Sequence, residues 1–156
     1  VSGGDMKVLA QKDPDLLPYL TAVHQFSEEH GVKAFSTECI EKRVVVPSAR
    51  SAGTLDFMGS FDGSPQVLLD WKTQKVRKEP WYYFNFPLQL AAYWKGLGGK
   101  GKICSVIIDT SGHAEYDVGK GVLPAIYFKA YESPMTYFKM FKNLSEIYYS
   151  MNNWEK

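Results

Sequence analysis

Two aspartates lie on either side of a hairpin signal in the stretch TLDFMGSFDGSPQVLLDWKTQ, residues 54–74. Two apolar runs flank an Asp-Gly pair that ends at Gly63, and this pair is typical of a tight turn between strands. In a hairpin centred on Gly63, Asp56 and Asp70 are equally far from the turn, so they face each other with Cβ atoms about 5 Å apart. A register shifted by one residue would remove this pairing. A separate alternative is two solvent-facing aspartates on an exposed face, with Lys72 as a local counter-charge.

Carboxylates that face each other across two strands repel unless something neutralises their charge. A divalent cation would do so, and a site made only of oxygen ligands suits Mg²⁺ or Mn²⁺ better than zinc. Side chains alternate along a strand, so Asp70 and Lys72 are expected on one face. Leu69 and Trp71 are expected on the other face, in the core. The pattern therefore predicts metal-ligating carboxylates with a lysine beside them.

A third carboxylate could reach the same face from the preceding strand. Glu41 lies in the segment ECIEKRVVV, which is rich in β-branched residues. Glu38 is the competing candidate, because the pleat of a strand places residues 38 and 41 on opposite faces. Either glutamate could instead be an ordinary charged residue of an edge strand.

The predicted elements place these residues in one α/β domain. Helices are expected at 13–31, 85–99 and 133–154, and strands at 35–47, 52–61, 66–73 and 101–112. Residues 114–128 are expected to form short strands or loop. Strands that alternate with helices favour a central mixed β-sheet flanked by helices. The chain length fits a single domain over residues 1–156.

Composition excludes several classes of protein. Apolar residues make up 45% of the chain, enough for a core, and the formal net charge of +1 does not by itself indicate a nucleic-acid binder. Cys39 and Cys104 lie far apart without metal-ligand spacing, so nothing indicates a disulfide framework, a zinc site or an iron–sulfur cluster. No apolar run reaches the ~20 residues that span a bilayer, and the first residues do not form a signal peptide. We therefore expect no membrane association.

A basic and aromatic segment follows the second aspartate. Lys75, Arg77 and Lys78 could neutralise phosphates. Four aromatic residues occupy positions 81–84 directly afterwards, and aromatic rings can stack on unpaired bases. The alternative is a solvated basic turn followed by aromatic residues of the core.

Two of the predicted helices have informative faces. Gln89 and Tyr93 are four residues apart and so share one face of their helix. They could contact a ligand there, or pack against a neighbouring element with Tyr93 in the core. The last helix has an apolar stripe that is expected to be core rather than an interface: Tyr137, Phe138, Phe141, Leu144 and Tyr148.

Three short motifs stand in order along the chain: GTLD at 53–56, LLDWKT at 68–73 and QLAAY at 89–93. Together they resemble the PD-(D/E)XK nucleases, and within them the RecB-like exonuclease branch, to which phage exonucleases and mitochondrial genome maintenance exonucleases belong. The resemblance runs from about residue 41 to residue 93 and fades beyond residue 110. It implies a restriction-endonuclease-like α/β/α core, and it leaves open whether N-terminal helices of the family are missing here.

The resemblance implies roles for individual residues. Asp56 and Asp70 would bind the catalytic metal, Mg²⁺ or Mn²⁺, together with the backbone carbonyl of Trp71. Lys72 would orient or activate the attacking water and stabilise charge that develops on the phosphate. The family's upstream glutamate falls on Glu41 rather than on its competitor.

Two features depart from the pattern of the family. Leu55 precedes the first aspartate, where the family commonly has proline. Many RecB-like members carry a histidine on a helix upstream of the core, and His24 is the candidate here. Because the helix at 13–31 runs directly into the strand of Glu41, we expect His24 to be a helix-surface or core-edge residue rather than a ligand.

The resemblance implies a divalent-metal-dependent DNA exonuclease that acts in recombination, repair or replication. It would work inside a cell, as a cytoplasmic or phage-encoded enzyme or in the mitochondrial matrix. Gln89 and Tyr93 would contact the nucleic acid near the cleaved end. The partners would be single-stranded or duplex DNA ends, with a homo-oligomer or a recombination protein as further candidates. The alternatives are a structure-specific endonuclease of the same fold and a non-catalytic nucleic-acid-binding module.

Overall fold

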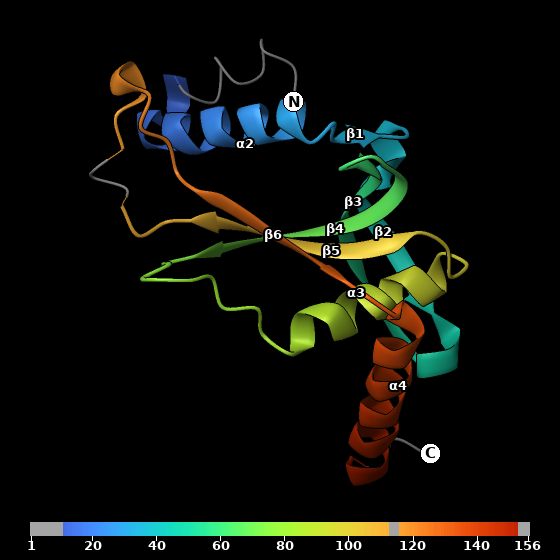
Figure 1. The fold of residues 1–156 in the computed structure, drawn as a ribbon. Coiled ribbons are helices and arrows are strands. Elements are labelled where there is room, and N and C mark those ends of the chain that lie inside the picture. Colours follow the sequence, from blue (N-terminus) through green and yellow to red (C-terminus); the bar gives the residue numbers. More distant parts are fainter. Residues whose placement is uncertain (1–10, 113–115, 153–156) are drawn as a thin grey trace.

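The chain folds around one mixed β-sheet with helices on both faces (Figure 1). The computed structural model describes residues 11–112 and 116–152. The strands are β1 (Lys33–Ala34), β2 (Ile40–Val46), β3 (Ser51–Phe61), β4 (Ser64–Gln74), β5 (Lys102–Asp109) and β6 (Ile126–Tyr131). The longer helices are α2 (Leu17–Glu29), α3 (Asn85–Gly96) and α4 (Pro134–Met151). This arrangement confirms the predicted α/β class, with a central mixed sheet flanked by helices.

Most neighbouring strands of the sheet are antiparallel. The order across the sheet is β1, β3, β4, β5 and β6, and β2 also pairs with β3. The parallel pair is β4 and β5. A parallel pair needs a crossover connection, and here α3 with its flanking loops provides it between the end of β4 and the start of β5. The crossover brings α3 against the β3–β4 hairpin.

Alternating side chains divide the sheet between two hydrophobic cores. The larger core lies under α3 and α4, and its fully buried members include Leu55, Leu68, Leu90, Ile103 and Ile107. The smaller core lies under α2 and consists of Phe26, Phe57, Phe61, Val67, Leu69, Cys104 and Val106. The neighbours Leu68 and Leu69 enter different cores, as the two-residue period of a strand requires.

Some predicted boundaries are wrong. The predicted strand at 35–47 begins only at Ile40, since Thr37–Cys39 forms a short 3₁₀ helix. Polar residues such as these favour local turns over extended backbone. The region at 114–128, predicted as short strands or loop, leads into β6, which pairs along most of β5. Residues 113–115 and the predicted end of the last helix at residue 154 lie outside the described residues.

Helix α4 contacts the core only along its first half. Phe138 is buried, and Tyr137 and Phe141 pack against the larger core. Leu144 and Tyr148 are 50% and 56% exposed. The prediction that the whole stripe is core is therefore wrong for these two residues, because α4 extends past the edge of the sheet (Figure 1).

Candidate active site

The β3–β4 hairpin has the predicted register through its middle. The paired positions there are Phe57 with Leu69, Met58 with Leu68 and Gly59 with Val67. Nearer the turn the register shifts, so that Phe61 pairs with Ser64. Continued one step away from the turn, the middle register places Asp56 opposite Asp70. The alternative register, in which the aspartates do not face each other, is wrong for this part of the hairpin.

The backbone ladder ends where the aspartates begin. Phe57 and Leu69 are the last paired positions of β3 and β4 on this side. Beyond them the backbone N–H of Trp71 donates a hydrogen bond to Asp56 Oδ2 at 2.7 Å. The N–H and C=O of one strand residue point toward the same neighbouring strand. The carbonyl of Trp71 is therefore also expected to face Asp56, as a metal ligand at this position would have to.

Asp70 is almost completely buried, with 2% of its surface exposed. Its Oδ1 accepts a hydrogen bond from Lys72 Nζ at 2.9 Å. Its Oδ2 is buried without a hydrogen-bond partner among the described residues. Burial raises the pKa of Asp70, the ammonium of Lys72 opposes this rise, and the charge of Asp56 adds to it. A buried carboxylate oxygen without a partner is costly, and a bound cation would satisfy it.

The ammonium group of Lys72 is held from two sides. It donates to Asp70, and its Nζ lies 5.6 Å from the centroid of the Phe86 ring, within cation–π range. The side chain is 29% exposed, so the charge has a defined position and is still accessible from solvent. Asp70 and Lys72 therefore lie together, as the alternation along the strand predicts.

Glu41 lies opposite Asp56 across the β2–β3 pair. This position follows from the pairs on either side of it: Ile40 with Phe57, and Lys42 with Leu55. Glu41 has a φ of 51°, in the left-handed region that residues other than glycine rarely adopt. Such strain persists where the surrounding structure holds it, and it is frequent at functional sites. Glu38 lies in the 3₁₀ helix before β2, so Glu41 is the upstream glutamate nearest the pair.

The donors around the aspartate pair are oxygen atoms, which Mg²⁺ and Mn²⁺ prefer. The unsatisfied Oδ2 of Asp70 fits a cation at this position. In the part of the chain that the structure describes, no three His, Cys, Asp or Glu side chains gather into a metal-binding group, and Glu41 is exposed. The residues that would hold a metal are therefore Asp56, Asp70 and the carbonyl of Trp71, with Glu41 at the rim.

The first and third motifs meet where β3 passes α3. The amide of Gln89 donates to the hydroxyl of Tyr93 at 3.1 Å, so the two residues share a helix face as predicted. A Cβ atom added at Gly53 would overlap the ring and hydroxyl of Tyr93. Any larger residue at this position would therefore require the side chain of Tyr93 to shift. Tyr93 is buried in the larger core, so Gln89 is the more accessible of the two for a nucleic-acid contact.

The basic segment forms a surface loop after β4. Lys75, Arg77 and Lys78 are all exposed. Val76 between them is buried, and its backbone N–H donates to Asp109 Oδ1 at 3.1 Å. The loop is therefore anchored at one apolar residue while its three basic side chains point into solvent.

The aromatic residues after this loop separate into two groups. Trp81, Tyr83 and Phe84 are 68%, 51% and 62% exposed. Tyr82 instead packs against the larger core, and burial raises the pKa of its hydroxyl to about 12. The side-chain amide of Gln74 exchanges two hydrogen bonds with the backbone of Trp81, at 2.7 and 3.0 Å. Three of the four rings thus remain available for stacking, and one is a core residue.

Comparison with known proteins does not assign this chain to a family. The chain matches no protein-family model, and no curated protein is significantly similar to it. The features that bear on function are therefore the side chains around Asp56, Asp70 and Lys72 and the resemblance of the three motifs.

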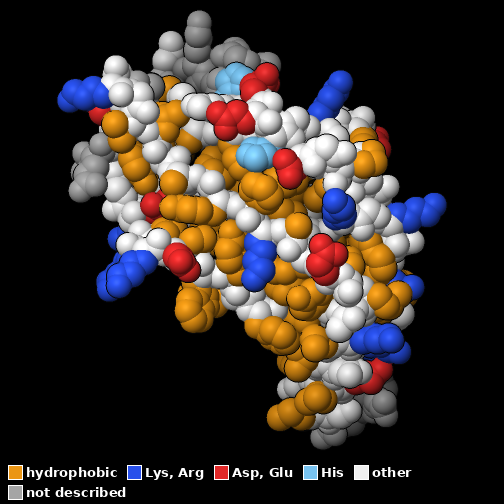
Figure 2. Space-filling model, in the orientation of Figure 1, with side chains coloured by type: hydrophobic (Ala, Val, Ile, Leu, Met, Phe, Trp, Pro, Cys, Tyr) orange, Lys and Arg blue, Asp and Glu red, His pale blue; other side chains and the backbone are white. Residues whose placement is uncertain are grey.

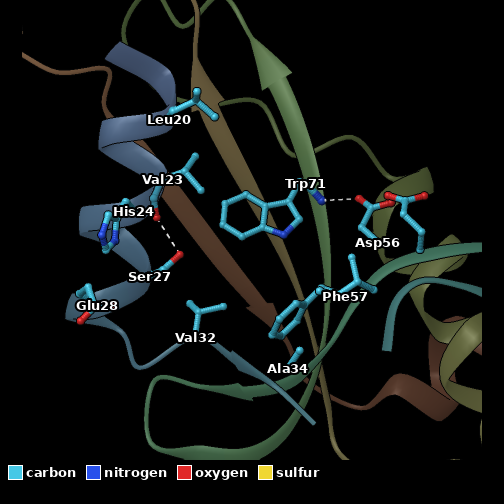
Figure 3. A pocket seen from close by; sticks show the side chains of 12 residues that line it. Leu20, Val23, His24, Ser27, Glu28, Val32, Ala34, Asp56, Phe57 and Trp71 are labelled. Atoms are coloured by element: carbon cyan, nitrogen blue, oxygen red, sulfur yellow. Dashed lines mark hydrogen bonds between the residues drawn. The ribbon is translucent and has the colours of Figure 1, made fainter. Parts of the chain in front are cut away.

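A cavity of ≈ 540 Å³ opens beside Asp56, between α2 and the sheet (Figure 3). Asp56 and Glu41 line it together with His24 and Glu28 of α2. Figure 3 shows the indole of Trp71 between α2 and Asp56, so this side chain lines the cavity as well as packing against the smaller core. The prediction that Trp71 points simply into the core is therefore incomplete. His24 is an exposed helix residue, as predicted, but sequence reasoning missed the cavity that it shares with the aspartate site.

Basic side chains are spread across the face shown in Figure 2 rather than gathered in one patch. This distribution agrees with the net charge of +1. A phosphate-binding surface would then be local, at the loop after β4. None of the described helices is long and apolar enough to cross a membrane.

Proposed function

We propose that this chain is a divalent-metal-dependent nuclease that hydrolyses phosphodiester bonds at DNA ends. One observation carries the proposal: the buried Asp70 has an unsatisfied Oδ2, accepts a hydrogen bond from the ammonium of Lys72 at 2.9 Å and is close enough to Asp56 for that charge to raise its pKa. Two negative ligands for a cation thus stand beside one positive group for a phosphate. The three motifs that contribute these residues support the RecB-like exonuclease type.

The residues of the site have separate tasks in this reaction. Asp56, Asp70 and the carbonyl of Trp71 would hold the metal, with Glu41 near its outer side. A divalent ion, when bound, lowers the pKa of a water molecule and polarises a phosphoryl oxygen. Lys72 orients the attacking water and offsets the negative charge that develops on the phosphate. Because Asp70 Oδ1 accepts from Lys72, Asp70 also aims the lysine at that phosphate.

Two neighbouring surfaces would bind the rest of the substrate. The exposed side chains of Lys75, Arg77 and Lys78 neutralise backbone phosphates as the strand leaves the site. Gln89, which is partly exposed on α3, contacts the nucleic acid near the cleaved end. The exposed rings directly after the basic loop offer stacking positions for unpaired bases.

The proposal is tested by cleavage of end-labelled linear single-stranded and duplex DNA, run beside a covalently closed circle. Each substrate is incubated with Mg²⁺, with Mn²⁺ or with EDTA. The variants are Lys72→Ala and, as a matched control, Lys139→Ala, which removes an exposed lysine of α4. We expect metal-dependent loss of the linear substrates, abolished by Lys72→Ala and unaffected by Lys139→Ala.

Other results would redirect the proposal. Cutting of the closed circle would identify a structure-specific endonuclease instead. DNA binding without cleavage under any metal condition would identify a non-catalytic binding module. A homo-oligomer, a recombination protein as partner and an intracellular location stay predictions from the resemblance.

A further inference from the structure

The cavity under α2 shares two residues with the candidate active site. Asp56 and Glu41 belong to both, and the cavity extends from them past Trp71 to α2 (Figure 3). Its volume of ≈ 540 Å³ lies in the range of small-molecule sites, about 300–1,000 Å³. A group that enters this cavity would therefore lie beside Asp56 and Glu41 of the candidate active site.

Aromatic side chains form one wall of this cavity. The indole of Trp71 and the ring of Phe57 both line it. Phe26 packs edge-to-face on Trp71, with ring centroids 6.0 Å apart and an interplanar angle of 78°. The indole is thus supported from the core side, which leaves it positioned as a stacking surface. Flat aromatic ligands, nucleobases included, are favoured by such a wall.

The charges of the cavity select against a phosphate. Among its described lining residues, Glu28, Glu41 and Asp56 are acidic, and no lysine or arginine is present. A phosphate placed there would be repelled, whereas a neutral base would not. Carboxylates accept hydrogen bonds from exocyclic amino groups, such as the N4 amine of cytosine. His24 and Ser27 add further polar groups on the α2 side.

We propose that this cavity receives the base of the nucleotide next to the scissile phosphate, stacked on Trp71. The inference depends on the proposed nuclease function and deepens it by naming what lies beside the reacting phosphate. Bases with an amino group, such as cytosine, bind better than thymine because they donate to Glu28, the lining carboxylate that is not assigned to the metal. The cavity thereby holds the terminal nucleotide while Lys72 and the aspartates act on its phosphate.

The first test is binding of deoxynucleosides to the protein in EDTA, followed through the indole N–H signals in NMR. Nucleosides lack phosphate, so neither metal nor catalysis is needed. Deoxycytidine is expected to shift the Trp71 signal saturably, with an affinity roughly threefold or more above that of thymidine. Trp94 is the internal reference, because its indole N–H donates to the Gly101 carbonyl at 3.0 Å inside the fold. Equal shifts of Trp71 and Trp94, or no saturable shift of Trp71, would overturn the inference.

The second test fills the cavity. Val23 lines it from α2, whereas Gln25 is exposed on the same helix and does not line it. Val23→Trp should abolish the nucleoside-dependent shift of Trp71, and the matched Gln25→Trp should leave it unchanged. On linear DNA, Val23→Trp should lower kcat/KM roughly tenfold for a normal end and much less for an end with an abasic terminal residue. An equal loss of kcat/KM on the substrate with a normal end and on the substrate with an abasic end would contradict a base-binding cavity.

The two proposals fail in different ways. Cleavage of DNA without nucleoside binding at Trp71 would support the proposed nuclease function and contradict the base-binding cavity. Nucleoside binding at Trp71 without DNA cleavage would support the base-binding cavity and contradict the proposed phosphodiester hydrolysis. Thermal melting of each variant identifies any that do not fold. The deoxynucleoside titration of the wild-type protein tests the base-binding cavity even if a variant fails to fold.

Discussion

Around β4, the two faces of the sheet differ in how their side chains are packed. On the α3 face, Leu90 is fully buried, and Asp70 and Lys72 are held with defined partners. On the α2 face, Trp71 and the half-buried Val23 line an open cavity. Three consecutive residues of one strand therefore alternate between the two faces. On the α3 face, hydrogen bonding and burial fix the position of the charges around β4. On the α2 face, the cavity beside Trp71 leaves room for a ligand.

The largest expected effect separates the roles of these two faces. Lys72→Ala should reduce DNA cleavage by about 10²–10³-fold or more, because it removes the positive charge at the phosphate. Trp71→Leu should reduce it only by roughly tenfold, because stacking is lost while the backbone carbonyl remains. Single-turnover rates on an end-labelled linear duplex measure both. A Trp71→Leu loss as large as that of Lys72→Ala would contradict the division between the faces.

The second effect concerns stability. Leu90→Ala should lower the free energy of unfolding by about 2–5 kcal/mol, because it opens a cavity in the closed core. Val23→Ala on the open face should cost about 1 kcal/mol or less, since this side chain already borders a cavity. Urea unfolding followed by circular dichroism gives both values. Similar costs for the two substitutions would show that the α2 face is as tightly packed as the α3 face.

A third prediction probes the contact between the first and third motifs. Gly53→Ala should destabilise the protein by about 1–3 kcal/mol, because the new methyl group overlaps Tyr93. Adding Tyr93→Phe removes the hydroxyl that lies nearest the new group and should restore part of the loss. Thermal melting of the single and double variants measures this coupling. A Gly53→Ala protein as stable as the wild type would show that Tyr93 can move away freely.

The smallest expected effect concerns the buried charge of Asp70. Its pKa is raised in the folded protein, so its contribution to stability is greatest at low pH and is lost as the pH rises through the folded-state pKa. Relative to the metal-free wild type, Asp70→Asn should therefore gain stability as the pH rises through the folded-state pKa of Asp70, and the difference should level off above it. The exposed Asp15→Asn serves as the control and should show no such trend.

The same variant tests the cation. Mg²⁺ or Mn²⁺ should raise the melting temperature of the wild type, because a ligand that binds the folded state stabilises it. The Asp70→Asn protein should show little of this increase. A metal-dependent increase of equal size in both proteins would place the cation somewhere other than the aspartate pair.

The sequence predicted well those features that depend on local geometry. The Asp-Gly turn predicted the register through the middle of the hairpin, and the alternation of side chains predicted Lys72 beside Asp70, because a hairpin joins residues that are close in the chain. The same reasoning failed for the strand at 35–47, where local turns of polar residues replaced extended backbone. It also failed for Leu144 and Tyr148, because helical periodicity does not reveal where the neighbouring sheet ends.

The sequence by itself thus determined the α/β class, the hairpin and the lysine beside the aspartate. Only the tertiary structure decided which oxygen of Asp70 lacks a partner, that Glu41 lies across from Asp56 and that Gly53 makes room for Tyr93. It also decided that α2 leaves a cavity beside Trp71. The physical reason is that burial, close approach and empty space arise between residues far apart in the chain, and no periodicity within a segment records them.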